Sequence, residues 1–181
     1  MYASALLVAV ALALVMGGDL RKIASLEIER LTWIAVSFAL PLAAPLALRA
    51  GLDVNVTAAI VTVLSYGMLF YGLAANMRLP GIAVIGLGSL ANLVALAANS
   101  FRMPVRLDLF DPAMRAQEAA RLAESLTHVP LDATTNLTFL SDVIPWRLFG
   151  GRPSMVSIGD ILIALGIAYL AFRSVKPRCL R

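Results

Sequence analysis

The stretch LAANMRLPGIAVIGLGSLANLVALAANSFRMPV, residues 73–105, decides the fold of this chain, because it holds a complete apolar segment between two nearly identical endings. Each ending, LAANMRLPG (73–81) and LAANSFRMPV (96–105), runs from leucine through two alanines to asparagine, and then to arginine, one apolar residue and proline. Asparagine can end a helix, arginine can reach lipid phosphates, and proline prevents a helix from continuing. The repeat therefore predicts two helix stops on opposite sides of a membrane.

The composition extends this interpretation to the whole chain. The 181 residues are 60% hydrophobic and only 14% charged, whereas about 25% of residues are charged in an average soluble domain. Long apolar blocks of nearly 20 residues are typical of transmembrane helices, which satisfy their own backbone hydrogen bonds in lipid. The sequence predicts an all-α, polytopic membrane protein that forms a single membrane domain over residues 1–181. Its predicted spans are 2–18, 31–48, 56–75, 81–98 and 156–172.

The basic residues indicate an orientation in the bilayer. With the N-terminus outside and the C-terminus inside, eight basic residues fall on the inner side and seven on the outer side. The most one-sided cluster is the C-terminal one, Arg173, Lys176, Arg178 and Arg181. We therefore expect a multi-pass protein of the cytoplasmic membrane of a bacterium. The net charge of +4 comes from residues that flank apolar blocks, so it indicates topology and no nucleic-acid partner.

Residues 101–153 form the long polar segment, which this orientation makes extracytoplasmic. About 50 residues without a cysteine pair are too few for an ordinary independent core, so the segment must rest on the helices or on a partner. Asp111 and Pro112 predict a helix start, and Glu118 belongs to the expected polar face of that helix. The residues after the helix are punctuated by proline and glycine, which predicts loops. Trp146 and Phe149 beside Arg147 and Arg152 suit the lipid headgroup region.

Two further segments carry structural expectations. The connection DLRKIASLEIERL (19–31) has apolar residues at helical spacing, which favours a short helix on the membrane surface. Its end, SLEIERL, also alternates, so a strand-like connection stays open. Pro41 and Pro45 lie inside the second predicted span, where proline removes a helical hydrogen bond and predicts a kink.

Candidate functional residues are few. His128, Asp132, Asp142 and Asp160 are the candidates for general acid–base chemistry. The second ending opens the polar segment, which makes Asn99, Arg102, Met103 and Pro104 the first choice for a ligand-binding rim. Further candidates are Trp146, Arg147 and Asn92, the last of which is expected either to bond another helix or to line a polar site. One histidine and one cysteine cannot form a Cys/His zinc site, so we expect no metal and no cofactor.

The chain resembles a bacterial membrane family catalogued as a domain of unknown function. The resemblance rests on GGDLRKIASLEIERL, on N-M-R-L-P-G (76–81) with Asn92 behind it, on N-S-F-R-M-P-V (99–105), and on the later T-H-V, S-D-V-I-P and S-I-G-D (157–160) stretches. It implies a five-helix membrane protein with an extracytoplasmic segment, and no known reaction. The family usually has glycines before Arg-Met-Pro-Val, where this chain has Ser100 and Phe101, so a tight glycine turn is not expected here.

Three functions follow as hypotheses. The leading one is a non-enzymatic accessory or assembly subunit that packs against other membrane subunits through small-residue helix faces. The second is a binder or carrier of an amphiphile, such as a lipid, a lipid-linked sugar or a quinone, at the outer face, where arginines can recognise phosphate. The third is a membrane-embedded hydrolase or transferase that uses His128 and the nearby aspartates.

Overall fold

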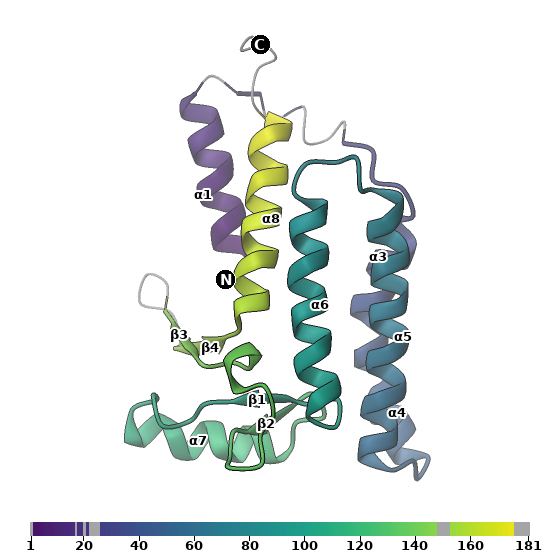
Figure 1. Cartoon of the computed structure of the whole chain (residues 1–181), viewed down its shortest axis with the longest axis vertical. Helices are drawn as coiled ribbons and strands as arrows, with labels where there is room; N and C mark the ends of the chain where they lie inside the picture. Colours follow the sequence, from purple (N-terminus) through teal and green to yellow (C-terminus); the bar gives the residue numbers. More distant parts are fainter. Residues whose placement is uncertain (1, 17, 20, 22–25, 148–152, 176–181) are drawn as a thin grey trace.

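The chain is a bundle of helices with a small polar module at one end (Figure 1). The module consists of the described residues between α6 and α8. The computed structural model describes residues 2–16, 18–19, 21, 26–147 and 153–175, with side chains from residue 6 onward. The bundle helices are α1 (Tyr2–Val15), α3 (Leu31–Ala39), α4 (Ala44–Arg49), α5 (Val54–Ala75), α6 (Ile82–Ala98) and α8 (Ile158–Val175). The predicted Lys176, Arg178 and Arg181 cluster, and Leu148, Phe149 and Arg152, lie outside the described residues.

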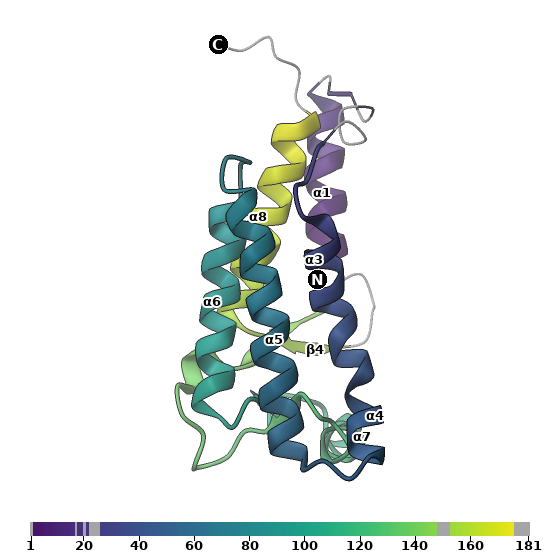
Figure 2. The same ribbon diagram turned by 90° about the vertical axis from the view of Figure 1, so that its right-hand side faces the viewer.

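Three of the helical segments are long and apolar enough to cross a membrane: Leu31–Arg49, Val54–Ala75 and Ile158–Val175. The apolar parts of the other two bundle helices, Leu6–Val15 and Ile82–Ala98, are shorter. The boundaries lie within three residues of the predicted blocks, with the largest differences at the end of α1, which is Val15 instead of residue 18, and at the end of α8, which is Val175 instead of residue 172. Helices α1, α5 and α8 run in one direction along the bundle and α3, α4 and α6 run in the other, so the module, the start of α5 and the start of α8 lie toward the same end of the bundle (Figures 1 and 2).

The two prolines of the second span interrupt its α-helix as predicted. One turn of 3-10 helix, η1 (Leu40–Ala43), separates α3 from α4, and Pro41 and Pro45 each stand at the start of a new helical piece. Proline cannot donate the backbone hydrogen bond that the preceding turn needs, which accounts for the change of helix type at this point.

Helices α6 and α8 approach each other at glycines. A Cβ on Gly81 would lie 2.2 Å from the carbonyl oxygen of Gly166, and a Cβ on Gly159 would lie 2.6 Å from that of Gly88. Neither distance leaves room for a side chain, so the close packing depends on glycine at these positions. The small residues of α6 therefore pack against α8 of the same chain.

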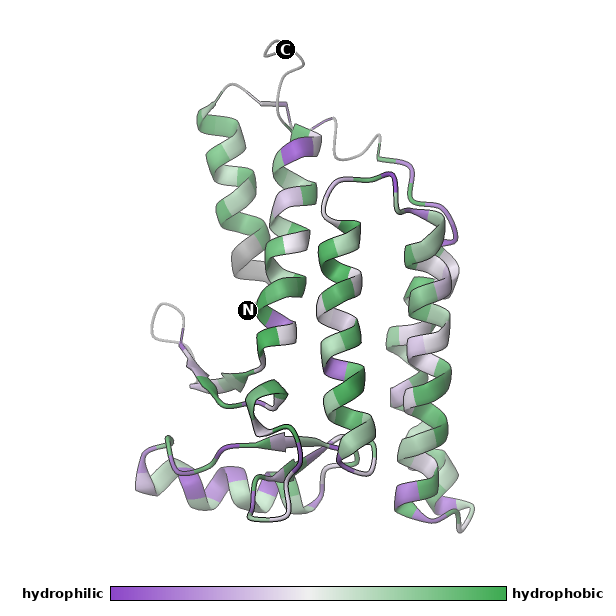
Figure 3. Cartoon of the chain, in the orientation of Figure 1, coloured by the Kyte–Doolittle hydropathy of each residue, from purple (hydrophilic) through white to green (hydrophobic). Residues whose placement is uncertain are grey.

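The bundle buries several polar side chains and exposes many large apolar ones. Its buried polar side chains include Ser37, Thr57, Ser65, Ser89 and Asn92, whereas large apolar side chains face outward. Phe38 is 69% exposed, Leu42 80% and Leu87 58%. The helices are mostly apolar along their length, while polar residues gather in the module and the connections (Figure 3). A soluble protein rarely exposes so much contiguous apolar surface, which suits a bundle surrounded by lipid.

The module is not purely helical, which corrects the all-α prediction. Besides α7 (Pro112–Ala123) and the 3-10 turn η2 (Thr138–Leu140), it has four three-residue strands: β1 (Met103–Val105), β2 (His128–Pro130), β3 (Ile144–Trp146) and β4 (Ser154–Val156). β1 pairs with β2 in parallel, and β3 pairs with β4 antiparallel. The predicted loops after α7 are therefore partly strands, which three-residue segments with prolines do not reveal by periodicity.

The module has a small core and also rests on the bundle. Val105, Phe110 and Leu122 form the core beneath α7. Met103 packs against Ala95 and Leu96 of α6. The prediction that the segment rests on the helices is thus confirmed for this contact, and α7 lies across the end of the bundle (Figure 1).

Helix α7 begins at the predicted cap. Asp111 is its N-cap residue and Pro112 its first helical residue, as expected. The expected exposure of Glu118 is wrong: this residue is 6% exposed and its carboxylate accepts a 2.6 Å hydrogen bond from Arg121. A paired carboxylate can be buried at the edge of a small core because the guanidinium replaces its lost hydration.

The connection before α3 was expected to be an interfacial helix or a turn, and it is described only in part. Arg21 has helical backbone, residues 22–25 lie outside the described part, residues 26–28 are irregular, and Glu29 and Arg30 form a turn. The backbone of Glu29 is hydrogen-bonded to Asn76 at the end of α5. The described residues 26–30 contain a turn and no strand, so they do not support the strand-like alternative.

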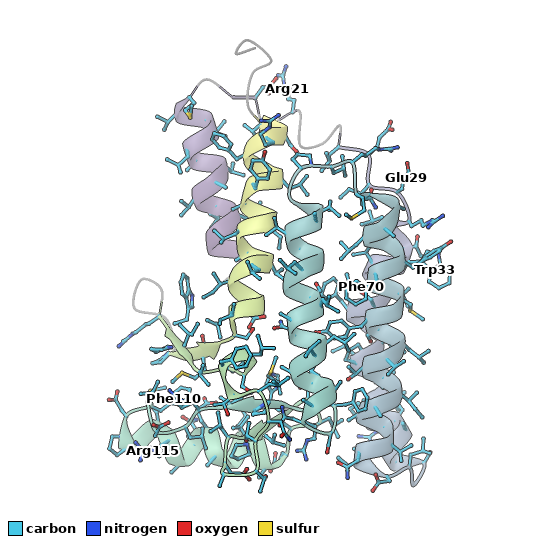
Figure 4. The ribbon with its side chains drawn as sticks, in the orientation of Figure 1. Arg21, Glu29, Trp33, Phe70, Phe110 and Arg115 are labelled. Carbon is cyan, nitrogen blue, oxygen red and sulfur yellow. The ribbon has the colours of Figure 1, made fainter. Side chains whose placement is uncertain are left out.

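Aromatic and basic side chains gather at the end of the bundle opposite the module. The Arg30 guanidinium lies 4.0 Å from the ring centre of Tyr71, and Trp33 meets Tyr71 edge-on at 5.5 Å. Arg173 lies 6.0 Å from the Tyr169 ring. Figure 4 labels Trp33 and Glu29 at this end, and Phe110 and Arg115 at the module end. Such side chains are typical of the membrane–water interface.

Candidate functional site

The two repeated endings each stop a helix with the asparagine that the sequence predicted. Asn76 is the C-cap of α5 and Asn99 is the C-cap of α6. Asn99 Nδ2 donates to the carbonyl of Ala95 (2.8 Å) and to that of Asn136 (2.9 Å), and its Oδ1 accepts from the Asn136 backbone N–H (2.9 Å). The side chain thus closes α6 and holds the loop after β2 at the same time.

The chain then turns through two residues with left-handed backbone. Ser100 has φ 55° and Phe101 has φ 60°. The chain adopts this turn although neither residue is glycine. Left-handed backbone costs a non-glycine residue about 1–2 kcal/mol, so the turn is strained in this chain.

Arg102, the next rim candidate, is used within the module. Its Nη2 donates to the carbonyl of Ser125 (2.7 Å) and to that of His128 (3.4 Å). Its Nε is buried and has no hydrogen-bond partner among the described residues. The guanidinium therefore holds the segment that leads into β2 against β1.

A pocket of about 470 Å³ opens beside these residues, at the junction of α5, α6 and the module. It contains three of the four predicted rim residues, Asn99, Arg102 and Pro104, whereas Met103 is buried in the contact with α6. Eight of its lining residues are polar: Asn55, Asn99, Ser100, Arg102, Asp132, Thr134, Thr135 and Asn136. Its volume lies within the range of about 300–1,000 Å³ that is common for small-ligand sites.

Asp132, a predicted catalytic candidate, lies in the wall of this pocket. Its Oδ1 accepts from the backbone N–H of Thr134 (2.8 Å) and from Thr134 Oγ1 (2.7 Å), and its own N–H donates to Thr135 Oγ1. The hydrogen bonds from Thr134 lower the pKa of the Asp132 carboxyl below its usual value. The pocket therefore presents an ionised carboxylate at neutral pH.

Asn92 and Asp160 are brought together by the α6–α8 contact. Asn92 Nδ2 donates to Asp160 Oδ1 (2.9 Å), and Asn92 Oδ1 accepts from Ser157 Oγ (2.8 Å). Ser157 and Asp160 also bond each other's backbone N–H, which is a capping box at the start of α8. The expected interhelical hydrogen bond of Asn92 is confirmed, and Asn92 does not line either described pocket.

His128 and Asp142 form a second pair of candidates. His128 Nε2 lies 3.8 Å from Asp142 Oδ2, while its Nδ1 lies 2.8 Å from Thr127 Oγ1. Asp142 is buried, and burial together with the nearby Asp160 charge raises the pKa of its carboxyl to about 7. Partial burial and the Arg121 charge lower the pKa of His128. The pair is therefore only partly ionic at neutral pH.

Trp146 and Arg147 lie apart from the rim. They line a second pocket of about 200 Å³ together with Phe110 and Asp111 at the start of α7. The predicted ligand-binding residues thus divide between two places in the module. Within the described residues, no group of three or more His, Cys, Asp or Glu side chains could hold a metal ion.

Several site residues escaped the sequence analysis. The pocket of about 470 Å³, called the main pocket below, is also lined by residues from segments far from Asn99 in the chain: Asn55, Thr134, Thr135 and Asn136. The Asp-x-Thr-Thr run at 132–135 is a recognisable side-chain turn, and Ser-x-x-Asp at 157–160 matches a capping box. Those two signals were available, whereas the role of Asn55 depends on the arrangement of the helices.

The fold and its outward-facing apolar surface are compatible with an integral membrane protein. Within that class, residues 25–172 match a family of unknown function, DUF5317, and the chain belongs to this family. The expected membership in such a family is confirmed, although the match begins after α1 and after the first residues of the GGDLRKIASLEIERL motif.

A relative with a similar sequence is an uncharacterized protein of Thermotoga maritima. It is 30% identical over 119 residues, and the alignment covers 66% of each chain. No solved structure matches this chain. The main pocket must therefore be interpreted from its own chemistry.

Proposed function

We propose that this chain is a five-span protein of the bacterial cytoplasmic membrane, and that it binds the headgroup of a membrane amphiphile in its main pocket. The module and the N-terminus face outward and the C-terminus faces inward. The observation that supports this proposal best is a polar pocket of about 470 Å³ that lies beside the exposed apolar face of α6.

Helix α6 connects the pocket to the apolar surface. Ala98 lines the pocket, and Val94, Leu90 and Leu87 continue from it along one helix face at intervals of three or four residues. These three side chains are 42%, 48% and 58% exposed. An amphiphile whose headgroup occupies the pocket therefore has an apolar surface for its chain.

The proposed topology rests on the two ends of the bundle. The end with Arg30, Trp33 and Tyr71 supports a membrane boundary there, and the module supports a boundary at the other end. Helix α6 has 17 residues, or about 26 Å at 1.5 Å per residue, which is close to the hydrocarbon thickness. Helix α1 is shorter at 14 residues, and its crossing depends on the residues that flank it.

A second candidate is the accessory or assembly subunit. Phe38, Leu42 and Leu46 recur every four residues along α3, η1 and α4, and are 69%, 80% and 65% exposed. Such a ridge of large side chains can pack into a groove between the side chains of another membrane helix. Capture in mild detergent should recover a defined partner that Phe38→Ala with Leu42→Ala releases, and recovery of a lone monomer would contradict this role.

A hydrolytic or transfer reaction has weaker support. Neither His128 nor Asp142 is among the residues that line the two described pockets. Asp160 is hydrogen-bonded to Asn92 and Ser157 at the start of α8. These groups therefore serve better as structural contacts between the module and the bundle than as an acid–base pair facing a substrate.

Native mass spectrometry of the protein released from detergent tests the binding proposal. We expect a retained lipid-sized mass that is lost in Asn55→Trp, because Asn55 lines the pocket at the exposed start of α5. Val54→Trp is the matched control, because Val54 is its neighbour and lies outside the pocket lining. An empty wild-type protein, or equal retention in both variants, would contradict the proposal.

Cysteine labelling tests the topology. With Cys179→Ser as background, a cysteine at Asp108 should react with a membrane-impermeant maleimide on intact cells, and a cysteine at Met77 should react only after permeabilisation. Both positions are exposed, so reactivity reports the side of the membrane. The reverse pattern would overturn the orientation.

A further inference from the structure

We infer that the headgroup bound by the main pocket is an uncharged, hydroxyl-rich one, such as the sugar of a glycolipid, and not a phosphate. This inference rests on the proposed function and adds the chemical class of the ligand. It comes from how the two charged residues of the pocket, Arg102 and Asp132, are already engaged.

Arg102 cannot offer the paired donors that favour phosphate. A guanidinium presents two edges for bidentate binding, Nε with Nη2 and Nη1 with Nη2, and both include Nη2. In this protein Nη2 donates to the carbonyls of Ser125 and His128, and Nε is buried. Arg102 therefore keeps only Nη1 without a partner and has no free pair of neighbouring nitrogens, whereas strong phosphate sites use a free fork.

Asp132 acts against an anion and in favour of hydroxyl groups. Its carboxylate is ionised, since its hydrogen bonds lower its pKa. Thr134 donates to Oδ1 through its backbone N–H and its hydroxyl, and Thr135 also donates to the carboxylate. The carboxylate is nevertheless exposed in the pocket wall, where its negative charge repels a phosphate and its lone pairs can accept a hydrogen bond from a hydroxyl.

The remaining polar lining combines donors and acceptors without net charge. Asn55, Ser100, Thr134 and Thr135 carry amide or hydroxyl groups, which can both donate and accept. A sugar ring also carries hydroxyls that both donate and accept, so several contacts can be satisfied at once. A lone anion needs donors only, and Asp132 then remains unfavourable.

Competition between two lipids with the same acyl chains tests the inference. Protein in nanodiscs of dioleoylphosphatidylcholine receives equal amounts of dioleoyl glucosyl diacylglycerol and dioleoylphosphatidylglycerol, and native mass spectrometry counts the bound lipids. We expect at least a tenfold preference for the glucosyl lipid. Preference for phosphatidylglycerol would overturn the inference and leave the pocket proposal standing, whereas retention of neither lipid would overturn both.

Two substitutions make the test specific. Asp132→Asn keeps the oxygen that forms the turn but removes the charge, and should reduce glucosyl-lipid retention about fivefold. Asp108→Asn is the control, because Asp108 is an exposed aspartate of the module outside the pocket lining. Asn55→Lys places a cation at the pocket and should shift the preference toward phosphatidylglycerol. Unchanged selectivity in both pocket variants would contradict the inference.

The source of the sugar is tested by methyl glucoside, which lacks the lipid chain. We expect millimolar methyl glucoside to displace less than half of the glucosyl lipid, because the α6 face adds apolar contact for the chain. Full displacement at that concentration would assign the pocket to a soluble sugar and overturn the lipid part of the inference.

Discussion

The two helix endings use the same side-chain geometry at opposite ends of the bundle. Asn76 Nδ2 donates to the carbonyl of Gly72, four residues back, and Asn99 Nδ2 donates to that of Ala95, also four residues back. Each amide also bonds both the N–H and the carbonyl of one remote residue, which is Glu29 for Asn76 and Asn136 for Asn99. The repeat is thus a helix stop that also fixes a distant segment.

The endings differ in burial and in how the chain continues. Asn76 is fully buried, and its partner Glu29 also forms an ion pair with Arg78. The chain then reaches Gly81, whose φ of 91° starts α6. Asn99 is half-buried, and the left-handed residues Ser100 and Phe101 follow directly. The same motif therefore gives a tight helical hairpin at one end and the wall of an open pocket at the other.

Gly81, which follows the first ending, is where we expect a substitution to destabilise the protein most. Gly81→Ala places a Cβ 2.2 Å from the Gly166 carbonyl and imposes left-handed strain, so we expect a loss of about 4 kcal/mol in the free energy of unfolding. Denaturation in detergent micelles measures this loss. Gly86→Ala is the control, since nothing lies within 4 Å of its Cβ position. Equal effects of the two substitutions would contradict the close α6–α8 contact.

Substitution of each capping asparagine compares how much the two endings contribute to stability. Asn76→Ala removes a fully buried amide and leaves the part-buried N–H and carbonyl of Glu29 unpaired, for an expected loss of about 3 kcal/mol. Asn99→Ala at a half-buried site should cost about 1 kcal/mol. The same unfolding measurement compares them, with exposed Asn55→Ala as the control. A larger loss at Asn99 would reverse the assignment of the stronger stop.

The stability of the protein should depend on pH through Asp142, which lies in the module. Its pKa is about 7 in the folded protein and 3.8 ordinarily, so the folded state binds more protons between these values. Stability therefore falls as pH rises, by about 2–3 kcal/mol between pH 5 and pH 8 from this group.

Asp142→Asn tests this pH dependence, because asparagine carries no titrating proton. It should flatten the stability profile and raise the melting temperature at pH 8. Asp132→Asn is the control, since its carboxyl pKa is shifted downward and it is exposed. An unchanged pH profile in Asp142→Asn would rule out Asp142 as the source.

The smallest predicted effect is a stabilisation, by a substitution in the turn after the second ending. Ser100→Gly relieves left-handed strain at an exposed position and should stabilise the protein by about 0.5 kcal/mol after the entropy cost of glycine. Ser154→Gly in the extended strand β4 should destabilise instead. Melting temperatures of both variants provide the measurement, and destabilisation by Ser100→Gly would contradict the strained turn.

The sequence was most informative where structure depends on neighbours in the chain. Apolar blocks predicted the bundle helices to within a few residues, and the two LAAN endings predicted their asparagine caps. Contacts between distant segments were not predictable in this way. The Asn92–Asp160 bond joins residues 68 positions apart, and the pocket combines Asn55 with residues of the module. The three-residue strands are too short to show the alternation of apolar and polar residues from which a strand is predicted.

The position of α1 has a consequence for the order of synthesis. This helix runs alongside α8 in the same direction, with Ala9 and Ala13 buried and the Asp19 N–H bonded to the Val175 carbonyl. The first and last described helices are therefore neighbours. Because α1 is synthesised long before α8, its α8-facing side stays uncovered until residues 158–175 have been made. A chain truncated before residue 158 should therefore expose Ala9 and Ala13 of α1.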